Sequence, residues 1–327
     1  MNNKIDFVVL WVDDTDPAWQ KAREAYGGDV DSRLNQESRY RDWGIFKYWF
    51  RGVEKFAPWV NKIHLVTADQ KPDWLDYSHP KLNAVSHQDF IDREFLPTFS
   101  SRPIELNLHR IPGLSEKFVY FNDDMFVVDH VAPGIFFKGD TPRDYGVKNP
   151  VPATSYGYVQ YNVLQAINRN FFHMNPIFES PLKWLNPRYG LMQLRTLLLL
   201  SWTSHLGFKV IHGPTSYRKT DFSLVWEAEH DLLYSTCRNR FRSSSDVNQQ
   251  IIRWWRLVEN RFTPIGFHKI SKDIYLRKSD VFLKYITRPS FPIICLNDNE
   301  STNFQFLQPL VSEAFSRLFP EKSAFEL

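Results

Sequence analysis

Short apolar runs rich in aromatic and β-branched residues alternate, in the first part of the chain, with longer segments of helical periodicity. The apolar runs predict strands at residues 5–12, 63–66, 82–85 and 118–121. Between them, residues 39–56 place large apolar side chains on one face and end at Ala57-Pro58, which predicts a helix, and residues 104–110 predict another. This alternation is typical of the α/β class, with a mostly parallel, Rossmann-like sheet flanked by helices.

From about residue 141 the pattern becomes helical before strands return. The elements predicted here are helices at 161–172 and 191–205, strands at 208–211 and 291–296, and a last helix opened by Pro309 and running through Leu318. We therefore predict three regions, namely an α/β half at 1–140, a helical insertion at 141–205, and a C-terminal part at 206–327 that completes the core.

A polar interruption follows the predicted strand at 118–121. Asn122, Asp123 and Asp124 break an apolar run that then resumes at Met125. Adjacent carboxylates at the end of a buried strand repel each other and lose hydration, unless a cation lies between them or the strand opens into a water-filled crevice. The alternative is that the two aspartates only begin a turn or cap a helix, which is the more frequent role of an isolated pair.

Other predicted strands also end in polar residues. Asp13 and Asp16 follow the first strand, His212 follows the strand at 208–211, and Asn297 and Asp298 follow the strand at 291–296. Ligands of open α/β sheets bind at such carboxyl ends, so these side chains are expected to share one crevice. Carboxylate oxygens are the ligands that Mg²⁺ or Mn²⁺ prefers. A lone histidine is more often structural than catalytic, but its position before Gly213-Pro214 favours a role at the site.

A cluster of arginines supplies the opposite charge. Arg238, Arg240 and Arg242 are closely spaced and precede three serines and Asp246. Guanidinium groups suit phosphate oxygens, so the cluster is a candidate diphosphate clamp, and a solvated helix face is the equally simple alternative. Carboxylates, a metal ion and arginine together are the groups used in phosphoryl or nucleotide-sugar chemistry.

Composition and charge exclude several classes of protein. A formal charge of +3 over 327 residues is too small to indicate a nucleic-acid partner. The two cysteines, Cys237 and Cys295, lack metal-ligand spacing and fit a reducing cytoplasm. We expect no signal peptide, and the apolar stretch at 197–202 is too short to span a bilayer, so membrane association would be peripheral, at the inner face of the cell membrane.

The motifs of several enzyme families are also missing from the sequence. The chain has no Gly-x-Gly-x-x-Gly after the first strand, no P-loop, no His-Glu-x-x-His and no Gly-x-Ser-x-Gly. The sequence therefore lacks the motifs that would indicate a dehydrogenase, a P-loop kinase, a zincin or an α/β-hydrolase.

Four blocks of the sequence together resemble the Stealth family, the hexose-1-phosphate transferases of bacterial capsule and cell-wall polysaccharide synthesis. This family also includes the catalytic subunit of the animal enzyme that adds N-acetylglucosamine-1-phosphate to lysosomal proteins. The blocks are residues 5–17, segments between 39 and 125 that close on Phe121-Asn-Asp-Asp-Met125, residues 212–214 with 240–246, and residues 294–298 with 319–323. Asp14 and Ala68-Asp69, in expected loops, depart from the family pattern. The resemblance therefore defines the sugar donor less closely than it defines the type of reaction.

The resemblance implies transfer of a sugar-1-phosphate, typically from a UDP-N-acetylhexosamine, to a hydroxyl of an acceptor glycan, which gives a phosphodiester and UMP. The half at 1–140 would then bind the nucleotide-sugar, and the insertion at 141–205 is a candidate acceptor site. The implied catalytic residues are Asp123, His212 and Arg242, the implied ligands of Mg²⁺ or Mn²⁺ are Asp123, Asp124, Asn297 and Asp298, and the implied nucleotide and sugar contacts are Trp11, Asp13, Asp16, Arg39, Gln70, Asn122 and Arg240.

His212 titrates in the range that a general base for the acceptor hydroxyl needs, with Asp123 as the second candidate. A role for His212 as a covalent phosphoryl carrier stays open. Two other functions stay open as well. One is a metal-dependent glycosyltransferase that releases UDP, and the other is a non-catalytic glycan-binding component of a capsule complex.

Overall fold

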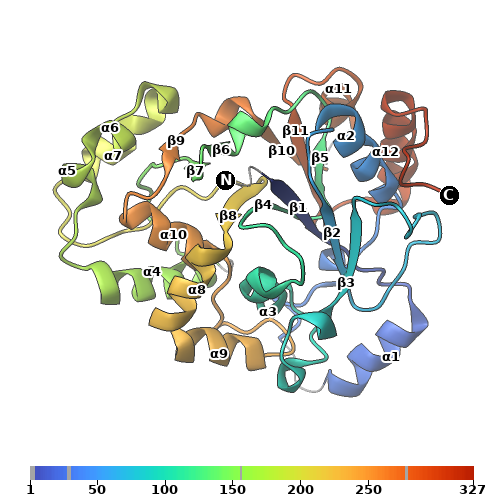
Figure 1. Cartoon of the computed structure of the whole chain (residues 1–327), viewed down its shortest axis with the longest axis horizontal. Helices are drawn as coiled ribbons and strands as arrows, with labels where there is room; N and C mark the ends of the chain where they lie inside the picture. The colour runs from blue at the N-terminus through green and yellow to red at the C-terminus, as the bar shows by residue number, and fades with distance from the viewer. Residues whose placement is uncertain (1–3, 28–30, 155–156, 277–278) are drawn as a thin grey trace.

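The computed structural model describes residues 4–27, 31–154, 157–276 and 279–327, and it confirms the α/β class. A five-stranded sheet lies at the centre, in the order β3-β2-β1-β4-β8 (Figure 1). Its strands are β1 (Ile5–Leu10), β2 (Ile63–Thr67), β3 (Leu82–Ser86), β4 (Lys117–Phe121) and β8 (Thr215–Arg218). The first four strands run parallel and β8 pairs antiparallel with β4. The predicted sheet therefore forms, because β1, β2 and β4 are apolar runs covered on both faces.

Two smaller sheets extend this core. One has the order β10-β11-β5 and the other β6-β7-β9. Their strands are β5 (Met125–Val127), β6 (Phe137–Lys138), β7 (Thr141–Asp144), β9 (Thr263–Pro264), β10 (Ser271–Tyr275) and β11 (Ile293–Asn297). The chain leaves the central sheet at Phe121 and enters the second at Met125, so Asn122, Asp123 and Asp124 lie where the two sheets meet.

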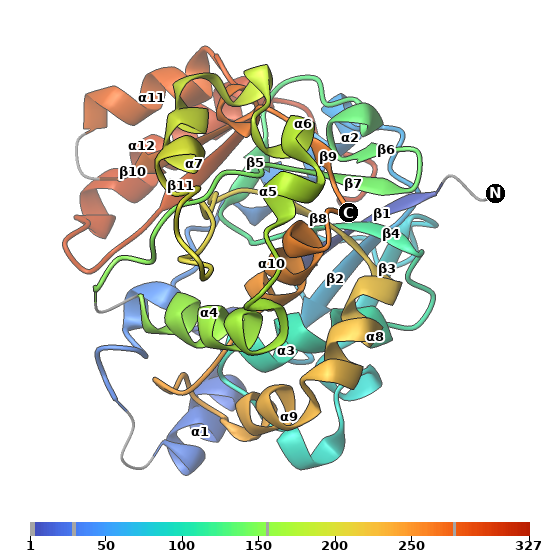
Figure 2. The ribbon, with the colours of Figure 1, turned by 90° about the vertical axis from the view of Figure 1, so that its left-hand side faces the viewer.

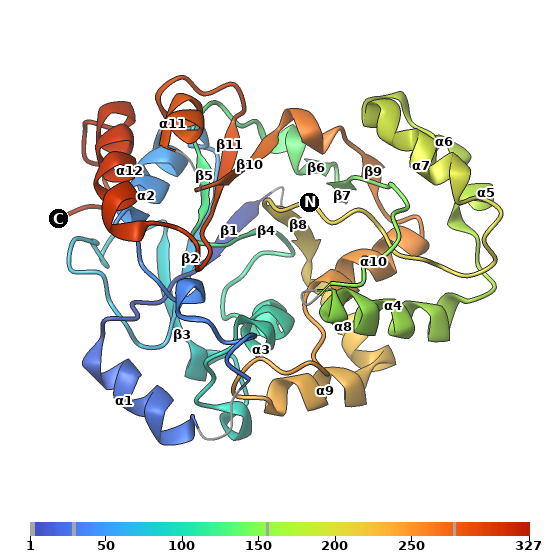
Figure 3. The ribbon, with the colours of Figure 1, turned by 180° about the vertical axis from the view of Figure 1, so that it is seen from behind.

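Helices cover both faces of the central sheet. They are α1 (Pro17–Tyr26), α2 (Phe46–Phe56), α3 (Ser101–Asn107), α4 (Tyr158–Phe171), α5 (Pro176–Glu179), α6 (Pro181–Trp184), α7 (Gln193–Leu198), α8 (Lys219–Ala228), α9 (His230–Arg238), α10 (Gln250–Val258), α11 (Ser279–Thr287) and α12 (Phe304–Leu318). Figure 3 shows α2 and α12 at one end of the molecule and α4, α8 and α10 at the other. Each end has its own hydrophobic core, one around Trp49 and Phe315 and one around Phe118 and Trp254.

The described part of residues 141–205, the predicted helical insertion, is mostly helical and includes one strand, β7. Strand β7 opens this region, and α4 to α7 follow (Figure 2). The helix predicted at 161–172 is confirmed as α4, whereas the helix predicted at 191–205 is much shorter and ends at Leu198. No helix in the described part of the chain is long and apolar enough to cross a membrane.

One predicted strand is wrong, and two predicted helices begin at other residues than predicted. Residues 39–45 are not part of α2, because Gly44 has a φ of +67° and breaks the helical backbone before Phe46. Residues 208–211 form a loop with a single bridge, between Phe208 and Lys148, and the strand follows at β8. His212 therefore precedes a strand instead of ending one. Pro309 lies inside α12, which Asn303 caps by accepting a hydrogen bond from Phe306 N at 3.3 Å.

Candidate active site

A cavity of about 1120 Å³ opens at the carboxyl ends of β1 and β4. The predicted site residues that line it are Trp11, Arg39, Asn122, Asp123, Asp124, His212, Arg242, Asn297 and Asp298. The structure thus brings together residues that are up to 287 positions apart, from Trp11 to Asp298. This position agrees with the rule that open α/β sheets bind ligands at the carboxyl ends of their strands.

The acidic turn after β4 is electrostatically unfavourable as it stands. Burial raises the pKa of Asp123 to about 8, and the negative charges of Asp124 and Asp42 add to that effect. Burial also raises the pKa of Asp124, although His212 partly opposes it. Asp124 Oδ1 is buried without a hydrogen-bond partner among the described residues. The turn therefore has the character of a cation or phosphoryl-binding site rather than of a satisfied cap.

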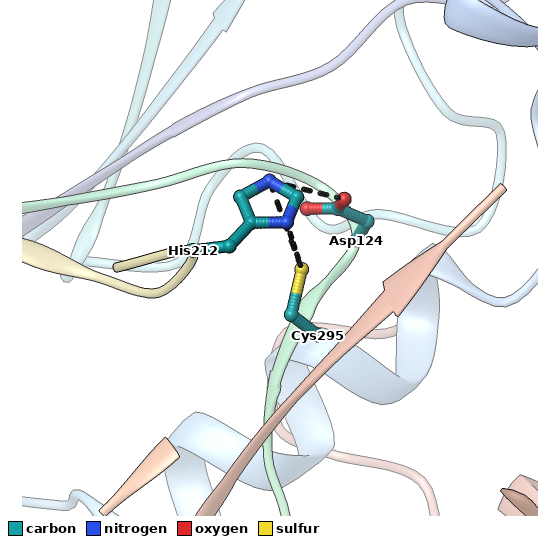
Figure 4. Close-up of side chains that lie close together, drawn as sticks. All are labelled: Asp124, His212 and Cys295. Atoms are coloured by element: carbon teal, nitrogen blue, oxygen red, sulfur yellow. Dashed lines mark hydrogen bonds and ion pairs between the residues drawn. The ribbon is translucent and has the colours of Figure 1, made fainter. Parts of the chain in front are cut away.

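His212 lies beside this turn on the loop before β8. Its Nε2 is 4.0 Å from Asp124 Oδ2, and its Nδ1 is 3.4 Å from Cys295 Sγ (Figure 4). Ligand atoms of Asp124, His212 and Cys295 all lie within 4.8 Å of one another, so this trio could hold a metal ion. Burial raises the pKa of the Cys295 thiol well above its usual value, and Asp124 and Asp273 reinforce this, so the sulfur is a weak ligand.

Oxygen donors around the same point fit a harder cation. Asp273, on β10, pairs in register with Cys295 on β11, and its Oδ1 is buried with no hydrogen-bond partner in the described part of the chain. Burial raises the pKa of Asp273, and the charge of Asp124 adds to this. Asn297 ends β11 and also lines the cavity. Asp124, Asp273 and Asn297 thus supply oxygen atoms of the type that Mg²⁺ or Mn²⁺ binds.

Asp298, a predicted metal ligand, already has cationic and polar partners. Its Oδ2 accepts hydrogen bonds from Arg41 NH1 at 3.1 Å and from Trp43 Nε1 at 3.2 Å. The pair with Arg41 balances its charge, which leaves Asp298 as a support for the loop after β11 in this state of the molecule.

The basic side of the cavity is centred on Arg242. Its backbone N donates to Asn35 Oδ1 at 3.0 Å, and its side chain reaches Ser101 Oγ at 3.4 Å. Burial lowers the pKa of Arg242 to about 10, and the positive charges of Arg39 and Arg102 act in the same direction. Arg102 is paired with buried Asp246, 2.5 Å from NH1 to Oδ2, whereas Arg242 places a dehydrated guanidinium group at the cavity, which suits an anionic ligand.

Arg240 is placed away from this group. Its guanidinium donates to the carbonyl oxygen of Pro97 at 2.8 Å and lies 4.8 Å from the ring centroid of Tyr26. Arg238 ends α9 and is exposed. Of the closely spaced arginines only Arg242 lines the cavity, because Arg238 ends α9 and Arg240, on the segment after it, contacts Pro97 and Tyr26.

Asp13, Asp16 and Gln70 form a hydrogen-bonded group beside the first strand. Gln70 Oε1 accepts from Asp13 N at 3.0 Å, and Gln70 Nε2 donates to Asp13 O at 2.7 Å and to Asp16 Oδ2 at 3.1 Å. Asp16 also caps α1 by accepting from Ala18 N at 2.9 Å. These contacts hold the loop after β1 in shape, so the three residues support the cavity wall that Trp11 lines.

Comparison with known proteins identifies the family. Residues 3–31 match the model of Stealth protein conserved region 1, and residues 39–144 match that of conserved region 2. The chain is 41% identical to the capsular polysaccharide phosphotransferase WcwK of Streptococcus pneumoniae, over 99% of this chain and 98% of that protein. The chain belongs to the Stealth family. It is also 40% identical to the receptor polysaccharide phosphotransferase WefC of Streptococcus oralis, over 99% of this chain and all of that protein.

A solved structure also resembles the chain. The galactosyltransferase LgtC, in complex with donor and acceptor sugar analogues, superposes over 95% of both chains with 9% identity and a TM-score of 0.40. The assignment of this Stealth chain as an enzyme of the phosphotransferase class rests on the full-length relatives.

The two Stealth regions hold only part of the site. They contain Trp11, Arg39, Asp123 and Asp124, whereas the loop with His212 and the segments with Arg242, Asp273 and Asn297 lie outside them. The cavity therefore depends on the fold to unite both halves of the chain.

Several cavity residues were not predicted as site residues, among them the acidic residues Asp42, Glu105 and Asp273. Burial raises the pKa of Glu105, whose Oε1 accepts from Tyr120 OH at 3.2 Å. The signal for Asp42 and Glu105 was available, since both fall within the second block that resembles the family. Asp273 carries no such signal, because it follows Lys272 in a short strand of mixed polarity and interrupts no apolar run.

Proposed function

We propose that this Stealth phosphotransferase transfers a hexose- or hexosamine-1-phosphate from a UDP-sugar to a hydroxyl of an acceptor glycan, in the synthesis of a capsular or cell-surface polysaccharide. The observation that carries the proposal is the arrangement of the cavity, in which Asp123 and Asp124 share one space with Arg242 and His212. Full-length relatives named polysaccharide phosphotransferases support the same reaction class.

In this reaction the acceptor oxygen forms a bond to the phosphorus that carries the sugar, and the anhydride bond between the two phosphates breaks. UMP leaves with the bonding electrons, and the anomeric carbon is untouched. Negative charge develops on the transferred phosphoryl oxygens and on the UMP oxygen. Arg242, assisted by Arg39, is the group we assign to the diphosphate.

The acceptor hydroxyl must lose a proton during the attack. We assign this proton to His212, because it lines the cavity beside Asp124 and because Asp124 Oδ2, 4.0 Å from its Nε2, stabilises the imidazolium that forms. Asp123 is the second candidate, since its pKa is raised to about 8. Trp11, which stacks on Phe46 with ring centroids 5.7 Å apart, is the wall we assign to the nucleotide or sugar.

The oxygen atoms of Asp124, with those of Asp123, Asp273 or Asn297, are the ones we propose for Mg²⁺ or Mn²⁺. A divalent cation bound there would neutralise charge on the diphosphate. His212 cannot be a metal ligand through Nε2 and accept the acceptor's proton at the same atom. The base assignment therefore favours the oxygen ligands over the trio that includes Cys295.

The first experiment identifies the nucleotide that is released. The purified protein is incubated with Mg²⁺, with UDP-N-acetylglucosamine or its galactose epimer, and with a panel of water-soluble glycosides as acceptors, and the products are separated by anion exchange. We expect UMP whose release depends on the acceptor. Acceptor-dependent UDP would instead mean a glycosyltransferase and would overturn the proposal. Since UDP-sugars are made in the cytoplasm, we place the reaction there.

The same assay tests His212. We expect His212→Ala to lower turnover at least a thousandfold while the circular dichroism spectrum stays unchanged, because a general base contributes about 10²–10⁴-fold. His230→Ala, which changes an exposed histidine on α9, is the matched control and should leave turnover unchanged. Near-normal activity of the His212 variant would remove this residue from the mechanism.

A further inference from the structure

A patch of exposed apolar side chains lies on helices α4 to α7, which we call the helical lobe (residues 158–205; Figure 2). Its most exposed members are Phe178, Leu182, Leu191, Leu194, Leu198 and Trp202, which are between 51% and 84% exposed. Burial of apolar surface is worth about 25 cal/mol per Å², so a patch of this kind marks a surface that another body covers.

Helix α7 shows that the exposure is built into the fold. Its polar residue Thr196 is buried, and Thr196 Oγ1 accepts a hydrogen bond from Lys148 N at 3.1 Å. Its leucines are exposed, and Leu194 and Leu198, four residues apart, lie on one face, while exposed Leu191 lies on the 3₁₀ helix (Pro187–Met192) directly before α7. A helix that packs on a protein core normally has the reverse arrangement, so the outward face of α7 is shaped for an apolar environment.

The charges around the patch select the kind of partner. Residues 172–202 contain three basic residues, Lys183, Arg188 and Arg195, and a single acidic one, Glu179. Arg188 and Arg195 are exposed beside the leucines. Leucine, phenylalanine and tryptophan side chains flanked by arginine are the composition that binds at the interface of an anionic bilayer.

The lobe is also joined directly to the active-site cavity. Tyr158, Val159 and Gln160, at the start of α4, line the cavity, and the chain lines it again at residues 209–213, soon after α7. The segment that carries the exposed patch therefore lines the cavity at both of its ends. A surface that covers the patch would hold the cavity close to itself.

We propose that the exposed face of the helical lobe binds the surface of an anionic lipid bilayer. The leucine, phenylalanine and tryptophan side chains enter the boundary between headgroups and acyl chains, and Arg188 and Arg195 contact anionic headgroups. The binding itself does not depend on the phosphotransferase reaction, whereas its use, access to an acceptor held at a membrane, rests on the proposed function.

Vesicle flotation tests the proposal. The full chain is mixed, without nucleotide, with vesicles of phosphatidylcholine alone or of phosphatidylcholine with 30 mol% phosphatidylglycerol. We expect at least tenfold stronger binding to the anionic vesicles. Leu191→Ser/Leu194→Ser/Leu198→Ser should weaken binding at least tenfold, and Arg188→Gln/Arg195→Gln should weaken binding to the anionic vesicles roughly fivefold for each arginine removed.

A matched control removes exposed apolar residues elsewhere. Leu224 on α8 and Phe306 on α12 are 46% and 58% exposed, so Leu224→Ser/Phe306→Ser should bind vesicles like the unchanged chain. Vesicle binding is measured without nucleotide or acceptor, and phosphotransfer by Leu224→Ser/Phe306→Ser, which lies outside the candidate acceptor region, should equal that of the unchanged chain, which separates failure of this inference from failure of the proposed reaction. Equal thermal unfolding verifies that each variant is folded.

Two results would overturn the proposal. One is an unchanged chain that binds neither kind of vesicle, or a leucine variant that binds as before. The other is self-association: if light scattering shows a dimer that Leu191→Ser/Leu194→Ser/Leu198→Ser converts to a monomer, and vesicles do not compete with it, the patch binds a second copy of the chain.

Discussion

The turn at Asn122–Asp124 illustrates how a residue can serve function at the expense of stability. The pKa of Asp123 is raised from 3.8 to about 8 by burial and by the charges of Asp124 and Asp42. Between these two pH values the folded protein binds a proton that the unfolded chain does not bind. The free energy of unfolding therefore falls as pH rises through this window.

From this linkage we predict that Asp123→Asn stabilises the protein, because an amide carries no charge at any of these pH values. The gain over the unchanged chain should grow by about 3–4 kcal/mol between pH 5 and pH 8, while turnover is lost. Urea unfolding at several pH values, without divalent cations, measures the gain. Asp129→Asn, at an exposed position, is the control. A gain independent of pH would show that the carboxylate of Asp123 is not desolvated.

How far the site could be predicted depends on how each residue stands out from its neighbours. Asp123 and Asp124 interrupt a buried apolar run, and that cost is visible in the sequence. Asp273 lies in a strand of mixed polarity, and only the pairing of β10 with β11 brings it near Cys295 and Asp124. In the sequence Asp298 resembles Asp124, but its carboxylate accepts hydrogen bonds from Arg41 and Trp43, which lie more than 250 positions away in the chain. Partners at such separation cannot be read from local patterns.

At the scale of elements, the position of the acidic turn depends on how α2 packs against β5. Gly52 lies in the middle of α2, and a Cβ atom there would lie 2.2 Å from the carbonyl oxygen of Val127. This close approach presses the second sheet against the helix. Since β5 follows directly after Asp124, the contact also fixes the direction in which the turn leaves the cavity.

We predict that Gly52→Ala destabilises the protein by about 2 kcal/mol, because overpacking costs about 1–3 kcal/mol and outweighs the gain in helix propensity. Turnover should fall as well, since β5 must shift. Thermal unfolding and the nucleotide-release assay measure the two effects. Gly134→Ala is the matched control, because a Cβ there meets nothing within 4 Å. An unchanged unfolding temperature of the Gly52 variant would contradict the close packing.

The elements that could be predicted are those whose apolar residues are continuous. Strands β1, β2 and β4 are buried on both faces, so mostly apolar residues mark them, such as those at 7–10 and 118–121. Strand β8 was missed because Thr215–Arg218 is polar and half-buried at the edge of the sheet. The apolar residues at 208–211 resemble a strand, yet Phe208 is buried between Trp184 and Trp254 as part of a loop. Tertiary packing, which no local pattern records, decides such cases.

At the scale of the whole molecule, a buried ion network joins the outer sheet to the central one. Asp144, on β7, accepts from Arg253 Nε at 2.9 Å and from Arg256 NH2 at 2.6 Å, and Arg256 NH1 donates to the carbonyl oxygen of Ser216 on β8 at 2.7 Å. Asp144 is 5% exposed, and the two arginines on α10 are 3% and 0% exposed. Asp144 thus pairs with both dehydrated arginines where three elements meet, and buried Asp221 gives Arg256 a second, more distant partner, with Oδ2 3.8 Å from NH1.

We predict that Asp144→Asn lowers the free energy of unfolding at pH 7 by about 3–4 kcal/mol, because Arg253 stays buried without its counter-charge and Arg256 keeps only Asp221, 3.8 Å away. Burial alone would raise the pKa of Asp144, but Arg253 and Arg256 outweigh it and lower the pKa below 3.8. The stabilisation is therefore present above that value and is lost as pH falls through the folded pKa, so the effect of the substitution should shrink below about pH 4.

Urea unfolding monitored by tryptophan fluorescence measures this effect. The matched control is Glu313→Gln, which breaks the exposed pair with Arg317 and should change stability by less than about 0.5 kcal/mol. Because the network ties β7 and β8 through α10, we also expect the Asp144 variant to unfold in two steps, with the outer sheet lost first. A single transition with the stability of the unchanged chain would show that the two arginines find other partners and that the outer sheet is held by its apolar contacts alone.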